Sequence, residues 1–309
     1  MRLLSSLCSV PSLAGRLLGE ELSLFGIAGL QLELRNGDNL DQLDAELDLL
    51  RRRLPWVSMA VISELAAFGP NPLHAQPLPG PAEARLCAAA KRNQLWLVPG
   101  SLFEKSGGQV FNTAPVISPE GTVVARYRKM FPFLPYEKGV TPGSEFVTFD
   151  IPGVGRFGVS ICYDMWFPET TRNLAWLGAE VMLHPSLTST IDRDAELAIG
   201  RANAMINQCY FLDINGAGDL ALGRSAIFGP GGEIICTAGS GREVLAVELD
   251  LQAVRTARTR GWLGLVQPLK SFRDSAVALP AHAPGARRSA YLDSLGPLTM
   301  PTRHGGLPT

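Results

Sequence analysis

The sequence predicts a layered α/β fold whose sheets contain both parallel and antiparallel strands. Short apolar runs typical of buried strands alternate with segments of helical periodicity, and this alternation favours helices packed on sheets. A strand followed directly by a helix opens the regular part of the chain. Between residues 109 and 128, two strand-like runs flank Pro119-Glu120-Gly121, which predicts an antiparallel hairpin with a tight turn. We therefore expect mixed sheets.

Local apolar periodicity predicts each element in turn. The run LFGIAGLQLEL at 24–34 predicts a buried strand, and the leucines of 39–54 recur at helical spacing. The segment 81–93 is rich in alanine and begins with Pro81, a residue that fits the first turn of a helix. The other predicted strands are 57–65, 95–103, the two arms of the hairpin at 109–128, 156–161, 180–186, 210–216, 225–230 and 243–250, and the other predicted helices are 168–178 and 192–207.

The composition indicates a chain with a large packed interior. Of its 309 residues 46% are hydrophobic and 18% are charged, against a usual charged share of about 25%. The 28 Lys and Arg residues nearly balance the 29 Asp and Glu residues, and the absence of a basic run argues against a nucleic-acid partner. No apolar run reaches the roughly 18 residues of a membrane span, so we expect a cytoplasmic protein without a membrane partner.

The cysteine and histidine patterns argue against several classes of site. The five cysteines are scattered, with no CxxC pair and no Cys/His cluster at metal-ligand spacing. The sequence also lacks HExxH, a phosphate-binding GxxxxGK[ST] loop and a GxGxxG motif after a strand. We therefore expect neither a metal nor an organic cofactor.

Two terminal segments differ from the regular part of the chain. Residues 1–23 contain two arginines with several Leu and Ser, a faint likeness to a transit peptide, but Ser and Pro break the apolar core, so we predict a plain N-terminal extension. Residues 281–309 are rich in Ala, Pro, Gly and Arg without periodicity, which predicts an extended tail, possible material for a subunit interface. The expected catalytic domain covers 24–280.

Cys162 is the first candidate for a reactive residue. It ends the apolar run GVSIC and precedes a polar turn and the helix predicted from Pro168, a position where a side chain is exposed and backbone N–H groups converge. A single cysteine at a strand end is more often a small core residue. A thiol nucleophile also needs a base that can be used again for water, so the interpretation depends on its neighbours.

Three charged residues supply candidates for those neighbours. Glu64 closes the apolar run VSMAVIS, Lys129 follows the second hairpin arm, and Glu137 lies eight residues later. The carboxyl edges of strands are where α/β sheets gather catalytic groups. Taken singly, each residue is better explained as a solvated charge, but the ordered set calls for a common explanation.

The set resembles the carbon–nitrogen hydrolase, or nitrilase, superfamily. The matching motifs are SEL around Glu64, YRKMFPF around Lys129, PYEKG around Glu137 and GVSICYDMWFPE around Cys162, in that order within about 24–270. The Cys-Tyr-Asp block followed by Phe-Pro-Glu is the most specific and is similar to the amidase-like branches. The later stretches GRANAMINQCYF, NGAG and GRSAIFGPGGEI also resemble the family. The resemblance implies a four-layer αββα sandwich with mixed central sheets.

The resemblance also implies a role for each motif residue. Cys162 would be the nucleophile, Glu64 the general base and acid, Lys129 a fixed positive charge and Glu137 a supporting second acid. The ammonium would lower the pKa of the thiol and, with the backbone N–H of Tyr163, face the oxyanion of the tetrahedral intermediate. His184 is the rival base, although no Asn or Asp that would orient it is identifiable. Asp164 is interpreted as structural, because the turn after a nucleophile needs a side-chain acceptor.

These motifs favour an amide substrate, with water as the second substrate. Tyr163 and Asp164 after the nucleophile are similar to amidase and carbamoyl-hydrolase branches, whereas nitrilases usually carry Trp-Glu there. Phe133, Trp166 and Leu187 are expected to border the pocket. No Arg or Lys stands out as a clamp for a substrate carboxylate, which favours a small neutral aliphatic amide converted to a carboxylic acid and ammonia.

Several alternatives stay open at this point. A nitrile or an N-carbamoyl amide could be the substrate, and an acyltransferase would form the same thioester but use another acceptor. A non-catalytic family member could serve binding or assembly, although all four catalytic positions are filled. The resemblance further implies a homodimer or a larger homo-oligomer, with the helices after Cys162 and the C-terminal tail as interface material.

Overall fold

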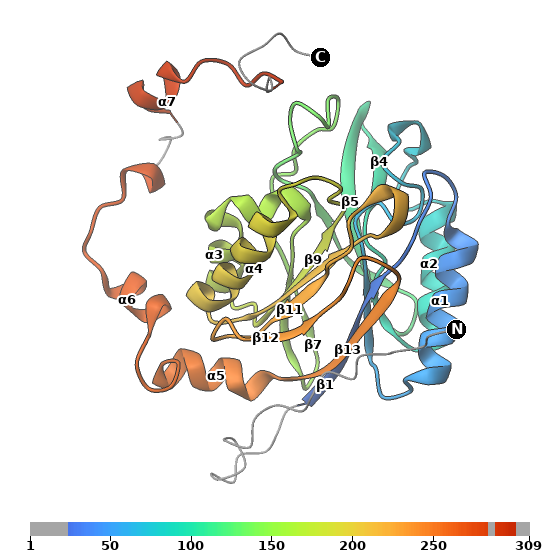
Figure 1. Cartoon of the computed structure of the whole chain (residues 1–309), viewed down its shortest axis with the longest axis horizontal. Helices are drawn as coiled ribbons and strands as arrows, with labels where there is room; N and C mark the ends of the chain where they lie inside the picture. Colours follow the sequence, from blue (N-terminus) through green and yellow to red (C-terminus); the bar gives the residue numbers. More distant parts are fainter. Residues whose placement is uncertain (1–23, 284–287, 301–309) are drawn as a thin grey trace.

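Two β-sheets pack face to face between two layers of helices in the computed structural model, which describes residues 24–283 and 288–300 (Figure 1). The first sheet contains β1 (Leu24–Gln31), β2 (Met59–Ile62), β3 (Trp96–Val98), β4 (Leu102–Ser106), β5 (Gln109–Ile117), β6 (Val123–Arg128) and β13 (Glu243–Asp250). The second contains β7 (Val147–Ile151), β8 (Gly155–Val159), β9 (Val181–Ser186), β10 (Tyr210–Asn215), β11 (Ala226–Phe228) and β12 (Ile234–Thr237). The outer faces are covered by α1 (Leu40–Arg53) and α2 (Pro81–Asn93) on the first sheet, and by α3 (Pro168–Trp176) and α4 (Arg193–Asn207) on the second (Figure 1). The predicted four-layer αββα sandwich is confirmed.

Both sheets are mixed, as predicted. In the first sheet β1, β2 and β3 run parallel, while β13 pairs antiparallel with β1 and the β5–β6 hairpin is antiparallel. In the second sheet β8, β9 and β10 run parallel, and β7 and β11 pair antiparallel with the ends of that set. Parallel neighbours need a crossover connection, and the helices on the outer faces provide it. The carboxyl ends of the parallel strands of each sheet therefore lie at one edge.

Alternating side chains of the strands build separate cores on the two faces of each sheet. In β1, Ile27 belongs to the core between the sheets, whereas Leu30 belongs to the core beneath α1 and α2. Helix α1 presents Leu43 and Leu47 to that outer core, as its helical leucine spacing predicts. A third core, which includes Phe211 of β10, lies beneath α3 and α4. Strands buried on both faces explain the nearly continuous apolar runs in the sequence.

The prediction of one strand over 95–103 is wrong, because the structure divides this segment into β3 and β4. Gly100 lies between them with a φ of +80°, and a Cβ there would lie 1.7 Å from the carbonyl oxygen of Ser63. A glycine is required at this close approach, and it turns the chain into the antiparallel β4–β5 pair. Strands β7 and β12 and the helices α5 (Leu251–Arg260), α6 (Pro268–Asp274) and α7 (Ala290–Ser294) were not predicted. They are short or follow directly on another element, so periodicity does not separate them from loops.

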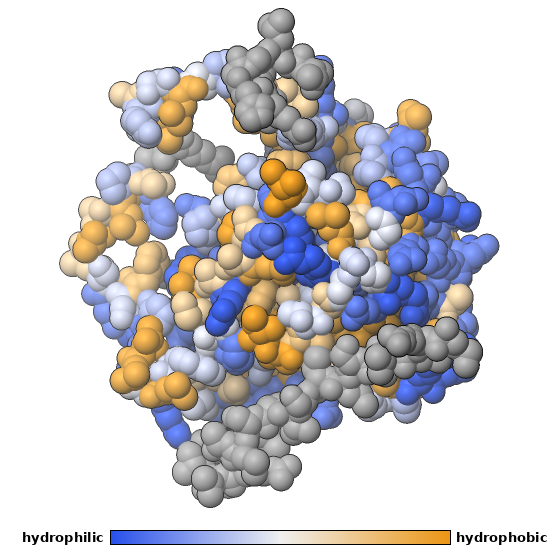
Figure 2. Space-filling model, viewed as in Figure 1, coloured by the Kyte–Doolittle hydropathy of each residue, from blue (hydrophilic) through white to orange (hydrophobic). Residues whose placement is uncertain are grey.

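The described part of the C-terminal segment lies outside the four layers. After α5 the chain continues through α6 and α7 along the outside of the molecule (Figure 1). Figure 2 shows hydrophobic side chains at the left of the view, where this segment lies; its exposed apolar residues include Val277, Leu279, Tyr291, Leu292 and Leu295. The predicted N-terminal extension, 1–23, lies outside the described residues. None of the helices within 24–283 and 288–300 is long and apolar enough to cross a membrane.

Candidate active site

Cys162 lies at a sharp turn just beyond the carboxyl end of β8. It is the first residue of a 3-10 helix, Cys162–Trp166, and its φ of +47° is in the left-handed region that residues other than glycine rarely adopt. Such a conformation persists only where the surrounding structure enforces it, and it is concentrated at functional sites. The side chain is thereby directed out of the strand.

Asp164 enforces that turn. Its carboxylate accepts hydrogen bonds from the backbone N–H of Ile161 at 2.8 Å, from the backbone N–H of Phe131 at 2.9 Å and from the Tyr127 hydroxyl at 2.7 Å. The carboxylate therefore ties the Cys162 turn to the segment that follows β6 in the other sheet. Burial raises the pKa of Asp164 to about 6. The structural role expected for this residue agrees with these contacts.

Glu64, Lys129 and Glu137 form a continuous chain of ion pairs, in which Glu64 and Lys129 are buried and Glu137 is half-buried. Lys129 Nζ lies 2.9 Å from Glu64 Oε1 and 2.6 Å from Glu137 Oε2. Glu64 follows β2 and Lys129 follows β6, while the loop after Lys129 brings Glu137 back, where it also accepts a hydrogen bond from the Phe133 N–H. The three residues that the sequence singled out thus converge at one edge of the first sheet. An ammonium held between two carboxylates is fixed in position as well as in charge.

Asn112 completes this cluster, and sequence reasoning missed it. Its side-chain N–H group donates to Glu64 Oε1 at 2.7 Å and to Glu137 Oε1 at 3.4 Å. The backbone N–H of Lys129 donates to the Asn112 carbonyl at 2.8 Å, so the β5–β6 pairing places the two residues opposite each other. The one signal in the sequence is an amide inside the otherwise apolar arm VFNTAPVI. A polar residue that a strand buries needs a partner, and here the partners are catalytic candidates.

The two sheets bring Cys162 and Glu64 together. The negative charge of Glu64 acts on the Cys162 thiol and raises its pKa, and the Glu64 backbone N–H donates to the Ser186 carbonyl of β9 at 3.1 Å. The backbone N–H of Leu187 acts in the opposite direction and lowers the pKa of the thiol. A nucleophile, a base and a fixed cation are therefore assembled from both halves of the sandwich, as nucleophilic catalysis requires.

Burial has the largest effect on the pKa values of Glu64, Lys129 and Cys162. It raises the pKa of Glu64, although the nearby Lys129 charge acts in the opposite direction. Burial opposes the charge of Lys129, yet the negative charges of Glu64, Cys162 and Glu137 raise the pKa of the ammonium well above its usual value. For Cys162, burial and then the Glu64 charge raise the pKa well above that of a free thiol. The expected lowering of the thiol pKa is therefore wrong for the resting site, because Lys129 is outweighed by desolvation and by the adjacent carboxylate.

Comparison with known proteins agrees with this geometry. A model of the carbon-nitrogen hydrolase family matches residues 34–259. The chain belongs to that family. The omega-amidase NIT2 of Homo sapiens is 31% identical over 202 residues, which cover 60% of this chain and 73% of that protein. Nit3 of Saccharomyces cerevisiae, a member of the nitrilase superfamily, superposes with a TM-score of 0.71 at 26% identity, over 76% of this chain and 93% of that chain.

A third relative extends the comparison to an amidase with a bound amide. A mutant of the Nesterenkonia sp. AN1 amidase, in complex with butyramide, superposes with a TM-score of 0.68 at 25% identity, over 76% of this chain and 94% of that chain. The predicted membership of the nitrilase superfamily, in its amidase-like branch, is confirmed. The protein is an amidase-type carbon–nitrogen hydrolase.

Aromatic rings from the turn that carries the nucleophile and from the loop after Lys129 form one group in this hydrolase. Phe133 lies 4.6 Å from Tyr136 and 4.8 Å from Tyr163 between ring centroids, and Trp166 lies 6.3 Å from Tyr163. Trp166 is 37% exposed, so this group reaches the surface beside Cys162. Of the three residues expected at the pocket, Phe133 and Trp166 thus lie in one aromatic group.

Leu187, the third of these residues, lies elsewhere around the nucleophile. Its side chain packs against a small apolar cluster that contains Phe103 and Val140, while its backbone N–H lowers the pKa of the Cys162 thiol. The Leu187 side chain therefore belongs to a different cluster from the aromatic group.

His184 does not occupy the position of a base in this hydrolase. Its Nδ1 lies 2.7 Å from the Ser160 hydroxyl, and its ring packs against Phe211 with centroids 5.0 Å apart. Burial lowers the pKa of His184 to about 4, so the imidazole stays neutral. Glu64 is the carboxylate whose charge raises the pKa of the thiol. Within the described ranges, no cluster of three or more His, Cys, Asp or Glu side chains is arranged to hold a metal ion.

Proposed function

We propose that this hydrolase cleaves small neutral amides through a covalent thioester on Cys162. The observation that carries the proposal is the chain of ion pairs from Glu64 through Lys129 to Glu137, whose Glu64 charge acts on the Cys162 thiol. Glu64 and Lys129 are buried, whereas Cys162 and Glu137 are half-buried. A carboxylate in this chain has the position that an imidazole has in other cysteine hydrolases. Its raised pKa suits a group that must hold a proton and then release it.

The first half-reaction forms the thioester. Glu64 takes the thiol proton as the sulfur attacks the amide carbonyl carbon, so the thiolate exists only as the C–S bond forms. Negative charge then develops on the carbonyl oxygen, for which the Lys129 ammonium and the Tyr163 backbone N–H are the proposed donors. The intermediate collapses as the C–N bond breaks, and Glu64 returns its proton to the nitrogen, which leaves as ammonia.

The second half-reaction regenerates the enzyme. A water molecule enters the position that ammonia vacated, and Glu64 takes its proton while the oxygen attacks the thioester carbon. The C–S bond breaks, the carboxylic acid leaves, and the sulfur regains the proton from Glu64. Glu137 and Asn112 keep Glu64 and Lys129 in place through both half-reactions, because each contacts at least one of them directly.

The residues beside Cys162 support the substrate class. Phe133, Tyr163 and Trp166 present aromatic surface, which suits an uncharged aliphatic group better than a carboxylate. Structures of the Nesterenkonia amidase contain butyramide, acrylamide, and the acetamide moiety of fluoroacetamide added covalently to the active site cysteine. The NIT2 relative is an omega-amidase, so ω-amides are the second class to test.

Ammonia release from a panel of amides tests the proposal. The panel contains small aliphatic amides, ω-amides, N-carbamoyl compounds and nitriles. We expect release from aliphatic amides that is lost in Cys162→Ala and in Glu64→Gln. Cys87→Ala, which removes another free thiol, is the matched control and should keep the activity. Full activity in folded Cys162→Ala would refute the thioester, and hydroxamate formation with hydroxylamine without hydrolysis would show an acyltransferase instead.

We also propose a cytoplasmic homo-oligomer in which residues 24–280 form the catalytic domain. The exposed apolar side chains of the described tail, outside the four layers, support an association surface there. Removing residues 281–309 should lower the number of subunits, calculated from the molar mass measured by light scattering, if the tail contributes to assembly. An unchanged number of subunits would exclude that role for the tail.

A further inference from the structure

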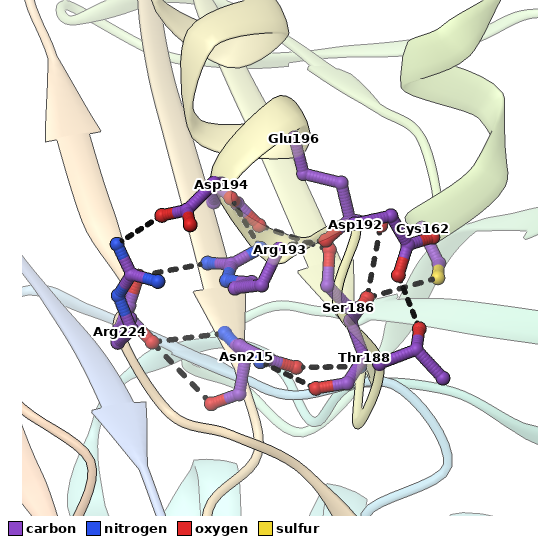
Figure 3. A network of polar contacts seen from close by, with 12 residues as sticks. Cys162, Ser186, Thr188, Asp192, Arg193, Asp194, Glu196, Asn215 and Arg224 are labelled. Atoms are coloured by element: carbon purple, nitrogen blue, oxygen red, sulfur yellow. Dashed lines mark hydrogen bonds and ion pairs between the residues drawn. The ribbon is translucent and has the colours of Figure 1, made fainter.

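A second buried charge cluster lies on the other side of the Cys162 sulfur. In Figure 3, Thr188 follows β9, and Arg193 and Glu196 belong to α4. Asp213, the fourth member of the cluster, belongs to β10. Glu196 Oε2 lies 3.0 Å from Arg193 Nη1, which in turn lies 2.8 Å from Asp213 Oδ2. The mechanism above uses none of these charges. Buried ions are costly to keep, so a cluster that touches the nucleophile calls for an explanation.

Thr188 connects the cluster to the nucleophile. Its Oγ1 lies 3.9 Å from Cys162 Sγ and donates to Glu196 Oε1 at 3.0 Å (Figure 3). Asn215 fixes the Thr188 backbone, because it accepts from the Thr188 N–H at 2.8 Å and donates to the Thr188 carbonyl at 3.1 Å. The hydroxyl is therefore held between one sulfur and one carboxyl oxygen.

The Thr188 hydroxyl can donate a hydrogen bond to only one of its two neighbours, Glu196 or Cys162. A threonine hydroxyl has one proton, and here that proton is directed to Glu196. The sulfur consequently faces an oxygen lone pair, which suits a thiol and opposes a thiolate. When Glu196 carries a proton, the carboxylic acid donates to Oγ1, and the hydroxyl proton is free to turn towards the sulfur.

We propose that Glu196 is a positioning residue for amide hydrolysis, which acts on Cys162 by setting the direction of the Thr188 hydroxyl. This inference rests on the proposed role of Cys162 as the nucleophile. With Glu196 protonated, the hydroxyl donates to the sulfur and stabilises the negative charge that develops during attack. With Glu196 ionised, that donor is lost, and the carboxylate charge adds its own repulsion.

The charges around Glu196 determine the pH at which it gains or loses its proton, and that pH lies within the range of an ordinary assay. The positive charge of Arg193, on the same helix, opposes protonation of Glu196, whereas the negative charge of Asp213, on β10, favours it. Cys162 and the neutral His184 also face the cluster. Burial, followed by the Asp213 charge, raises the pKa of Glu196 to about 7. Replacing Glu196 by glutamine leaves one cation facing one anion, so a folded variant is expected.

Alkylation of Cys162 by iodoacetamide tests the inference directly. The sulfur forms a bond to carbon, iodide leaves with the electrons of the C–I bond, and the thiol proton passes to Glu64. The rate is measured for the peptide that contains Cys162, by mass spectrometry, at about pH 5.5 and at about pH 8.5, on either side of the Glu196 pKa of about 7. Glu196→Gln imitates the protonated state at both values, because its amide donates to Thr188.

We expect the ratio of the Glu196→Gln alkylation rate to the wild-type rate to depend on pH. Glu196→Gln should react at the wild-type rate at about pH 5.5 and about tenfold faster than wild type at about pH 8.5, the effect of one hydrogen bond to a charged group. In a Thr188→Val background the same substitution should change nothing at about pH 5.5, and at about pH 8.5 it should have only the smaller effect of removing the Glu196 charge. Thr188→Ser, which keeps the hydroxyl, should restore the pH-dependent ratio, and kcat/KM should show the same pattern.

Each other outcome counts against the inference. An equal ratio at both pH values would show that Glu196 is only structural. An effect of Glu196→Gln that persists in full in the Thr188→Val background would show that the charge acts through space rather than through the hydroxyl. If Glu196→Gln fails to fold, Thr188→Val alone decides: it should be about tenfold slower than wild type at about pH 5.5 and close to wild type at about pH 8.5. The thioester proposal is tested separately by Cys162→Ala, so the two failures are distinguishable.

Discussion

Replacing Asp164 by alanine tests the turn that carries the nucleophile. The substitution leaves three buried donors without an acceptor: the Ile161 N–H, the Phe131 N–H and the Tyr127 hydroxyl. Each unpaired buried donor costs about 1–3 kcal/mol, so the free energy of unfolding should fall by about 3–9 kcal/mol if the site stays dry. Part of the free energy of unfolding that is lost is regained at neutral pH, because a buried carboxylate charge disappears with the side chain.

The loss of stability in Asp164→Ala should depend on pH, because Asp164 binds a proton more tightly in the folded state. The folded-state pKa of Asp164 is about 6, above the ordinary value of 3.8, so the folded state binds the proton more tightly. The stabilisation by that proton is fully present below the unfolded-state pKa and is lost as the pH rises through about 6. At about pH 5 some 1 kcal/mol of it remains, and at about pH 8 none does. The difference between wild type and Asp164→Ala should therefore be about 1 kcal/mol larger at the lower pH.

Urea unfolding followed by tryptophan fluorescence measures both quantities. Tyr127→Phe is the matched control: it removes one of the three bonds together with its donor, so a loss of about 1 kcal/mol is expected. Because Asp164 remains, the control should keep the pH dependence. A loss below 1 kcal/mol in Asp164→Ala, or an equal loss at the two pH values, would refute the assignment of the turn to this carboxylate.

Three further substitutions extend the test to the rest of the site. Asn112→Ala removes a donor from Glu64 and should lower kcat/KM about tenfold in steady-state assays; a wild-type value would show that Asn112 does not stabilise the base. Glu137→Gln should move the acid limb of the kcat/KM profile to lower pH, since the Glu137 charge raises the pKa of Glu64, and an unmoved limb would contradict that coupling. His184→Gln should flatten the loss of stability that the wild type shows between pH 6.5 and about 4, where the buried imidazole must gain a proton; urea unfolding across that range decides.

Sequence reasoning reached the fold because apolar periodicity is a direct consequence of burial. The leucines of α1 and the alanine-rich helix α2 were predicted within a few residues, and the turn at 119–121 was placed correctly between β5 and β6. The error at 95–103 arose because Gly100 serves a contact with Ser63, which is distant along the chain. Periodicity reports the face of one element and contains no information on such an approach.

The sequence predicted the active site to a similar extent as it predicted the fold. Motif residues were found because their neighbours in sequence identify them, and the structure brings Glu64, Lys129 and Glu137 into one chain of ion pairs. Asn112 and Glu196 carry no local signal, since each is a polar residue whose partners come from other elements. The pKa of Cys162 was misjudged for a related reason: the attraction of Lys129 could be inferred from the motif, but the burial that outweighs it is a property of the packed sandwich.

The division of the site between two sheets shows why the sandwich itself is part of the chemistry. Glu64, Asn112 and Lys129 are held by the first sheet, whereas Cys162, Thr188 and Glu196 are held by the second and its helices. An acid from each half acts on the nucleophile: Glu64 through its charge, and Glu196 through Thr188. A thiol between two buried acids stays protonated until a substrate supplies a carbon to attack. The base that removes the proton and the group that stabilises the resulting charge can then be altered independently, because they belong to different layers of the fold.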